Sequence, residues 1–427
     1  MGRMMRRAAL GVVLWGTCSW GHGAADYELK PAEYSKAGDK NGVTALAKSL
    51  PDLLKRRGAK ESLKWVLGKL DVPVDSQMLV FSKTSEQNPL IHPRNPRAIY
   101  FSEDYYIGYV PGGVIELIAV DDPSGPMFYT FDPRQGDGSP GFVRDRSCLR
   151  CHASARTQDV PGMLVRSVHA DQDGQLALQW GSYLTLPSSP LKERWGGWYV
   201  TGTHGDAQHM GNKVTKKLED GTYQYQFEHG QNVESLDAYV DLNRHLTDTS
   251  DIVALMVMEH QIAVHNTFYS AMFGYQRAAF LQRALHPDEY PEDNAQLKRL
   301  EKSYSDAVLR AILMVDHVAL PVDGVDGSAA FQEAFKEAGV RSVEGWSLRD
   351  LRLQKRLFKY RCSYMVHSAA FGHLPLAIRE QVLERLYQHL NHKAEPGFPE
   401  LSERERERIH AILHQSIAGY PGGVVPK

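Results

Sequence analysis

The sequence has few cysteines, no excess charge of either sign and no long apolar run. Its 427 residues include four cysteines, too few for the disulfide framework of small secreted domains. The 49 Lys+Arg residues nearly balance the 51 Asp+Glu residues, so the basic field needed for sequence-independent nucleic-acid binding is missing. Beyond the N-terminal region, no stretch supplies the ~20 consecutive apolar residues of a membrane helix. We therefore expect no nucleic-acid partner and no integral membrane segment in the mature chain.

What the composition does provide is enough apolar material for a folded core. Hydrophobic residues make up 42% of the chain and aromatic residues 10%, which excludes a disordered or collagen-like protein. The length predicts about two to three domains.

The first 25 residues have the order of a secretory signal peptide. Arg3, Arg6 and Arg7 precede an apolar run over residues 8–15, and small residues follow over residues 21–25. The apolar run is too short to span a bilayer comfortably. A buried first helix is the alternative interpretation. We predict a signal peptide over residues 1–25 and an exported protein, periplasmic or otherwise outside the cytoplasm.

The most informative motif is Cys148-Leu149-Arg150-Cys151-His152. C-x-x-C-H is the attachment signature of c-type haem. Two thiols three positions apart can each form a thioether with one vinyl group of haem, and the adjacent histidine becomes the proximal iron ligand. The sequence thus predicts one covalent haem c, bound through Cys148, Cys151 and His152.

Three other interpretations of this motif remain open. A thioredoxin-type redox pair is expected at a strand-to-helix junction, whereas this pair follows a loop rich in glycine and proline over residues 136–141. A zinc site needs a second ligand pair, and the chain has no other pair of closely spaced cysteines. A local disulfide would leave His152 without a role.

The chain divides into two parts at residues 230–250. Residues 26–235 are expected to form an α+β domain with a small antiparallel sheet and the haem motif, and residues 236–427 an all-α domain. A first helical stretch is predicted over residues 45–71. Strands are predicted at residues 78–81, 98–101, 105–110, 114–120, 127–131, 163–168, 175–186, 198–203 and 223–227. Helices are predicted at residues 252–273, 294–315, 329–338, 348–368, 376–390 and 402–417.

A c-type haem has either a second axial ligand or an open position on its distal side. Candidates for the distal ligand downstream of the motif are Met163, His169, His204, His209 and Met210. Met163 follows Pro161-Gly162, a turn that could return the chain over the ring. Arg194, Trp195, Trp198 and Tyr199 could supply an aromatic wall and a propionate partner, although core packing is the ordinary role of such aromatic residues.

The helical half carries a cluster of its own, made of methionines, histidines, a glutamate and an asparagine. They are Met256, Met258, Glu259, His260, His265 and Asn266. His260 and His265 are five positions apart, so they do not share one helix face and cannot grip one metal as an i, i+4 pair does. Glu259, His260, His317, His367 and His373 could still converge from different helices on a metal, whereas ordinary pairing inside the core is the simpler expectation. Cys362 has no visible partner and is expected to be a buried free thiol.

These motifs resemble uncharacterised exported bacterial proteins that carry a single haem c. The resemblance rests on residues 97–101, on Cys148–His152, on residues 160–162 and 194–199, and on residues 259–261 in the helical half. It implies a haem c and no established activity. The sheet that precedes the motif is also similar to PAS-type sensor domains with haem c.

Three functions fit these expectations. An exported electron-transfer protein with a redox partner protein needs only the motif, and we favour it. A haem enzyme of peroxidase or oxygenase type would need an open distal position and acid/base help from His204, His209 or Glu259-His260. A haem-c sensor or binding module is the third. The sequence does not determine the substrate, the potential or the oligomeric state.

Overall fold

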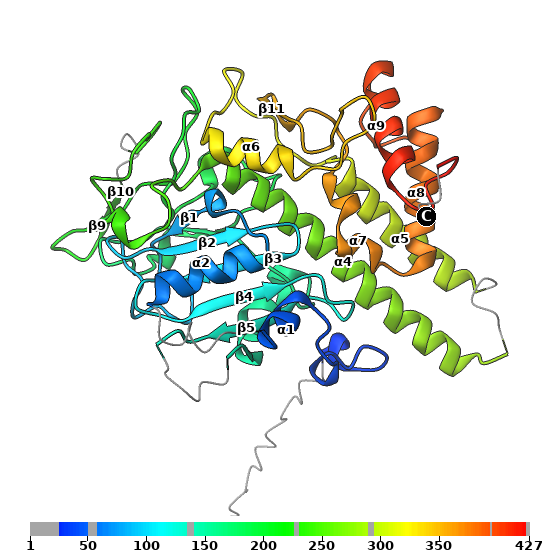
Figure 1. Cartoon of the computed structure of the whole chain (residues 1–427), viewed down its shortest axis with the longest axis horizontal. Helices are drawn as coiled ribbons and strands as arrows, with labels where there is room; N and C mark the ends of the chain where they lie inside the picture. The colour runs from blue at the N-terminus through cyan, green and yellow to red at the C-terminus, as the bar shows by residue number, and fades with distance from the viewer. Residues whose placement is uncertain are drawn as a thin grey trace, which may run out of the picture.

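The protein combines an antiparallel sheet with a large helical layer, as the computed structural model in Figure 1 shows. The structure describes residues 25–49, 58–134, 141–225, 230–288, 294–392 and 395–423. The predicted signal peptide lies outside these residues except for its last position. A mixed α+β fold is confirmed.

The sheet is a meander of six strands in sequence order, and it contains all five strands predicted between residues 78 and 131. Every neighbouring pair is antiparallel. Turns that contain glycine and proline follow residues 109 and 119, and Gly112 in the first of them has a φ of 92°, which L-residues rarely adopt. The strands are β1 Met78–Val80, β2 Arg97–Phe101, β3 Tyr105–Tyr109, β4 Ile115–Ala119, β5 Met127–Phe131 and β6 Val143–Arg144.

Alternation along the strands gives the sheet two different faces. Ile99 pairs with Gly108, and Gly108 pairs with Glu116 on the next strand, so these three positions share one face. The neighbouring positions, such as Tyr100 and Leu117, belong to the opposite face and are buried in the core. The face that carries Ile99, Gly108 and Glu116 is the one that matters for the site.

Two short helices precede the sheet where one helical stretch is predicted over residues 45–71. They are α1 Gly42–Ala47 and α2 Ala59–Lys69, and the residues between 50 and 57 lie outside the described part. Leu63, Val66 and Leu67 of α2 are buried at helical spacing. Figure 1 shows α2 lying over the sheet.

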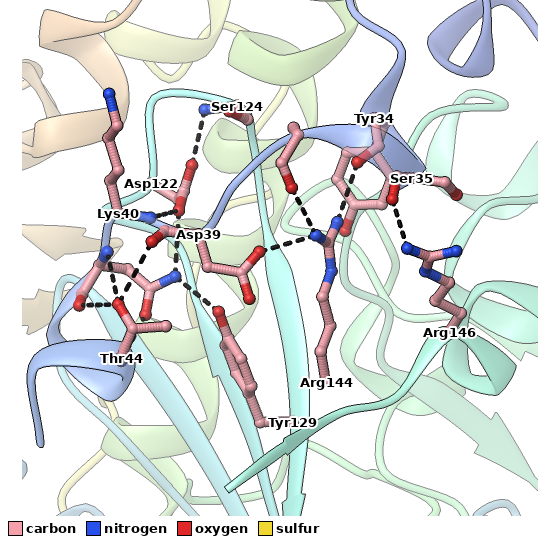
Figure 2. Close-up of polar contacts among 12 residues, drawn as sticks. Tyr34, Ser35, Asp39, Lys40, Thr44, Asp122, Ser124, Tyr129, Arg144 and Arg146 are labelled. Carbon is pink, nitrogen blue, oxygen red and sulfur yellow. Dashed lines mark hydrogen bonds and ion pairs between the residues drawn. The ribbon is translucent and has the colours of Figure 1, made fainter. Parts of the chain in front are cut away.

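The N-terminal segment is tied to the strand that leads into the cysteine motif (Figure 2). The Arg144 guanidinium donates to the carbonyls of Tyr34 and Ala37, at 2.9 and 2.8 Å, and pairs with Asp39 at 2.7 Å. Arg146 donates to the carbonyl of Ser35. These contacts fix the chain only a few residues before Cys148.

The longest helix, α4 Ile252–Leu285, belongs to the second half of the chain and packs against the sheet of the first half. Asp251 caps its first turn by accepting a hydrogen bond from the Ala254 N–H at 2.8 Å. Gln261 donates to the carbonyl of Ser102 at 2.7 Å, and the Tyr269 hydroxyl donates to the carbonyl of Val120 at 2.9 Å. Side chains of both halves form one hydrophobic core.

Apart from α6 Ala329–Glu337, which lies near β1 and β2, the remaining helices of the second half lie to one side of the sheet (Figure 1). Helix α5 Ala295–Ile312 packs against both α4 and α8 Leu376–Asn391, and α9 Glu403–Ser416 packs against α8. Four of the five predicted helices after α4 are present with closely similar bounds. These four are α5, α6, α8 and α9. A further short helix, α7 Ala369–Gly372, lies between α6 and α8 in the chain.

The helix predicted over residues 348–368 is wrong. This segment forms a hairpin of β11 Leu351–Gln354 and β12 Arg356–Phe358, so the second half is not purely helical. Leu353 and Lys355 have φ values of 61° and 60°, which are incompatible with a right-handed α-helix.

The strands predicted after the motif are shorter than expected. Two hairpins are formed by β7 Arg166–Val168 with β8 Ser182–Leu184, and by β9 Thr215–Lys217 with β10 Tyr223–Tyr225. The strand predicted over residues 198–203 is wrong, because this segment makes only isolated bridges, such as Val80 with Trp198 and Thr201 with Asp251. In the described part of the chain, no helix combines the length and apolar character needed to cross a bilayer.

Candidate functional site

The cysteine motif lies on a short helical turn that follows β6. A 3-10 turn over Arg146–Cys148 leads into the four-residue helix α3 Leu149–His152. Asp145 starts the turn by accepting a hydrogen bond from the Ser147 N–H at 2.9 Å. A helical turn brings positions i and i+3 to the same side. Both thiols are free, and Cys148 is half-buried whereas Cys151 is exposed.

The surroundings of Cys148 do not favour thiolate chemistry. Burial, together with the negative charges of Asp145, Glu116 and Glu86, raises the pKa of the Cys148 thiol to about 12. Redox exchange and zinc binding both use the thiolate, whose formation this environment opposes. A thioether carries no charge and is compatible with the same environment. The raised pKa of the Cys148 thiol therefore argues against the redox and zinc interpretations.

A pair of hydrogen bonds fixes the imidazole of His152. Its Nδ1 lies 2.9 Å from the carbonyl oxygen of Gly162, and its own carbonyl accepts a hydrogen bond from the Gly162 N–H at 2.8 Å. Because a carbonyl only accepts, Nδ1 carries the proton and Nε2 keeps its lone pair. Burial lowers the pKa of His152, which also favours the neutral ring. This is how proteins orient a histidine that ligates a metal through Nε2.

Helix α4 holds the segment behind His152 through Asn266. The Asn266 side chain accepts a hydrogen bond from the Met163 N–H at 2.9 Å and donates one to the Met163 carbonyl at 2.7 Å. Gly162 passes so close that an added Cβ would lie 2.5 Å from Asn266 Oδ1. The imidazole is thus held against a long helix that begins about a hundred residues later in the sequence.

A cavity opens beside the motif, between the sheet face described above, α4 and residues 151–166. This motif cavity has a volume of about 150 Å³ and opens to solvent. His152 and Cys151 line it, and the His152 ring packs on Phe128 with centroids 5.0 Å apart. Its aliphatic lining residues are Val80, Ile99, Ile107, Ile118, Leu164, Val165 and Ile262.

Charged side chains in the motif cavity are mostly arginines. Arg97 forms an ion pair with Glu116 across Gly108, whose missing side chain leaves room for the guanidinium. Arg156 and Arg166 also line the cavity and form no ion pair within the described residues. Burial lowers the pKa of Arg166, and the positive charge of Arg156 lowers it further. This part of the wall is electropositive and suits a carboxylate-bearing ligand.

Of the predicted distal ligands, the structure brings only Met163 into the motif cavity. His204 and His209 pack together with ring centroids 4.6 Å apart, and they do not line the cavity. His204 Nε2 accepts a hydrogen bond from the Asn232 N–H, and His209 Nδ1 accepts one from the Gly211 N–H. They are ordinary buried histidines held by backbone groups.

The other two distal candidates are also placed elsewhere. The Met210 sulfur accepts a hydrogen bond from the Ser167 hydroxyl at 3.5 Å, and Met210 does not line the motif cavity. His169 packs against Trp180 with ring centroids 5.6 Å apart.

The segment over residues 194–199 contributes less to the cavity than expected. Trp198 lines the motif cavity, but Arg194 does not, so its expected role as a propionate partner is not supported. Arg194 instead forms a buried ion pair with Glu259 of α4 at 2.8 Å, and Trp195 donates its indole N–H to the same carboxylate. Tyr199 packs on Phe81 in the core. These contacts fasten the segment to α4.

Sequence reasoning named Met258 only within the cluster of the helical half and did not name Tyr106, and both line the motif cavity. Met258 of α4 lines the motif cavity and is 2% exposed. Tyr106 of β3 also lines it, and its hydroxyl lies 3.0 Å from His265 Nδ1 and accepts a hydrogen bond from Gln261 at 2.9 Å. A methionine at helical spacing resembles core packing in the sequence, so no local signal distinguished Met258.

The histidines and the glutamate expected to converge in the helical half do so only in part. His260 Nδ1 lies 3.2 Å from His317 Nε2, and His260 Nε2 contacts the Ser363 hydroxyl at 2.7 Å. Glu259 is committed to Arg194, and His367 contacts Ser416 instead. Within the described residues, no group of three or more His, Cys, Asp or Glu side chains could hold a metal ion.

Cys362 is buried and free, as expected. Comparisons with known proteins bring no further assignment: no family model, no curated protein and no solved structure matches this chain.

Proposed function

We propose that this protein is an exported electron-transfer protein with one covalent haem c. Cys148 and Cys151 would bind the haem through thioethers, and His152 would be the proximal ligand of its iron. When bound, a haem held this way supplies one-electron redox chemistry. A redox partner protein would exchange the electron.

One observation carries the proposal: the His152 ring faces the motif cavity with Nε2 available, because Nδ1 is engaged by the Gly162 carbonyl. Here the ring is oriented and backed as a metal ligand requires. Cys151 lines the same cavity, so the covalent attachment and the axial ligand belong to one site.

The residues present also fit the chemistry of a haem. The porphyrin is a large apolar plane, and the walls of the motif cavity are mainly apolar, with Trp198 among the lining residues. Haem propionates are carboxylates, and Arg156 and Arg166 give the cavity a positive edge without acidic partners of their own in the described part. The aliphatic walls would exclude water from the metal, while Cys151 lies exposed where an electron could leave.

The first test is the covalent cofactor itself. The full-length protein is produced in a bacterium that attaches haem c in its periplasm, and the mature protein is examined by absorption spectroscopy and intact-mass measurement. We expect a haem c spectrum and the mass of one added haem. The double variant C148A/C151A should be colourless, whereas C362A, at the buried free cysteine, should retain the haem. A colourless wild-type protein would refute the proposal.

A haem enzyme of peroxidase or oxygenase type is a second candidate, and Tyr106 favours it. Enzymes of this kind need a proton donor or acceptor near the reacting ligand. His204, His209 and the Glu259-His260 pair do not line the motif cavity, but Tyr106 does, with His265 hydrogen-bonded behind it. Rapid binding of carbon monoxide by the reduced protein would favour the enzyme. A reduced spectrum unchanged by carbon monoxide would favour electron transfer.

A further inference from the structure

We propose that Met258 is the distal ligand, so that the iron has histidine on one side and methionine on the other. This inference rests on the proposed function, since it assumes the covalent haem. It names a residue that neither the motif nor its sequence neighbourhood indicates.

The choice lies between two methionines, because Met163 and Met258 are the two that the described walls of the motif cavity contain. Met163 directly follows Gly162, whose carbonyl accepts the hydrogen bond from His152 Nδ1. Both backbone groups of Met163 are held by Asn266. The Met163 backbone is therefore fixed behind the imidazole, on the proximal side.

Met258 approaches the cavity from the other end of the same helix face. It lies eight residues before Asn266, which is two turns of α4, or about 12 Å along the axis. Ile262 lies midway between them and also lines the cavity. Asn266 holds the segment behind His152, so Met258 lines the cavity two turns of α4 away from that point. Met258 is thus the methionine of the cavity wall whose backbone is not tied to the segment behind the imidazole.

Other potential ligands in the cavity wall are already engaged. The Tyr106 hydroxyl interacts with His265 and Gln261, and Glu116 forms an ion pair with Arg97. The Met258 thioether is uncharged and needs no deprotonation to bind iron. Its 2% exposure and aliphatic neighbours suit the neutral sulfur ligand of a high-potential haem.

The experiment compares Met258→Leu with Met163→Leu, a matched pair of substitutions within one cavity. The variants are made in the full-length protein and purified with haem attached. Three properties are measured: the weak long-wavelength absorption band of a methionine-ligated ferric haem, the reduction potential, and carbon monoxide binding by the reduced protein. We expect M258L to lose the band, to show a lower potential and to bind carbon monoxide. M163L should behave like the wild type in all three.

The outcomes separate this inference from the proposed function. A coloured wild-type protein without the methionine band, or loss of the band in M163L but not in M258L, overturns the role of Met258 while leaving the haem in place. A colourless wild-type protein overturns both. If M258L does not mature, Met258→His provides the second test, because an imidazole at this position should restore a low-spin haem without the methionine band. A high-spin M258H protein would contradict the inference.

Discussion

At Gly162, a missing side chain lets the chain pass between Thr157 and Asn266 and present its carbonyl to His152. An added Cβ would lie 2.5 Å from Asn266 Oδ1 and 3.2 Å from Thr157 Cβ. We predict that Gly162→Ala lowers the free energy of unfolding by about 1–3 kcal/mol, the usual cost of overpacking. Urea unfolding followed by circular dichroism measures this.

Gly68 provides the matched control. It lies in α2, and an added Cβ would meet nothing within 4 Å. Gly68→Ala should therefore raise the free energy of unfolding by about 0.5–1 kcal/mol, because alanine loses less conformational freedom in a helix. Equal changes in the free energy of unfolding for the two substitutions would show that Gly162 has room for a Cβ atom.

The residues of the candidate site differ in how well the sequence could predict them. Cys148–His152 is contiguous, so its chemistry was readable without a fold. Met163 was also predictable, because a Pro-Gly turn brings it back toward the motif. Met258, Asn266 and Tyr106 could not be found this way. They reach the cavity only through the packing of α4 on the sheet, which no local pattern encodes.

Helix α4 is fastened to the segment over residues 194–199 by a buried ion pair. The side chains of Glu259 and Arg194 are 0% and 5% exposed, and Trp195 shares the carboxylate. Glu259→Leu would leave the Arg194 charge buried and unpaired. We predict a loss of about 3–5 kcal/mol in the free energy of unfolding.

The same substitution at an exposed ion pair is the control for that prediction. Glu86 pairs with Arg150 at 2.6 Å, with side chains 51% and 71% exposed. Glu86→Leu should change the free energy of unfolding by no more than about 1 kcal/mol. If both substitutions cost the same, the contact between Glu259 and Arg194 does not hold α4 in place.

The sequence predicted secondary structure correctly where runs of strand-forming residues alternate with turn residues. The prediction failed where the backbone turns within an apolar segment. The five strands between residues 78 and 131 are short runs rich in β-branched and aromatic residues, separated by turn residues, and all five are found. Over residues 348–368, leucines at short spacing fit a helix as well as a strand. The φ values of Leu353 and Lys355 decide for a hairpin, and no count of apolar residues predicts them.

At the scale of the whole molecule, acid should destabilise the fold through buried histidines. His245 is 4% exposed, and neither of its ring nitrogens has a partner among the described residues. Burial, together with the positive charges of Arg244 and Lys60, lowers the pKa of His245 to about 4. The neutral His245 side chain therefore makes its full contribution to the free energy of unfolding above about pH 6.5. This contribution is lost as the pH falls toward 4, because only the unfolded chain takes up the proton there.

His245→Leu removes this contribution. Between pH 7 and pH 5, the variant should lose about 2 kcal/mol less unfolding free energy than the wild type. Urea unfolding at the two pH values measures the difference. An identical pH dependence in both proteins would contradict the prediction. His286→Leu, at an exposed histidine, is the control and should follow the wild type.

The ties between the N-terminal segment and Arg144–Arg146 also bear on when a cofactor could be attached. Arg144 and Asp39 are 105 positions apart, so their contact closes a loop that contains the first five strands of the sheet. A loop of this length closes at a large entropic cost unless the strands inside it have already paired. We expect the cysteine turn to stay movable until that late step. During this interval, both thiols would be accessible to a maturation enzyme, because this part of the chain would not yet have folded.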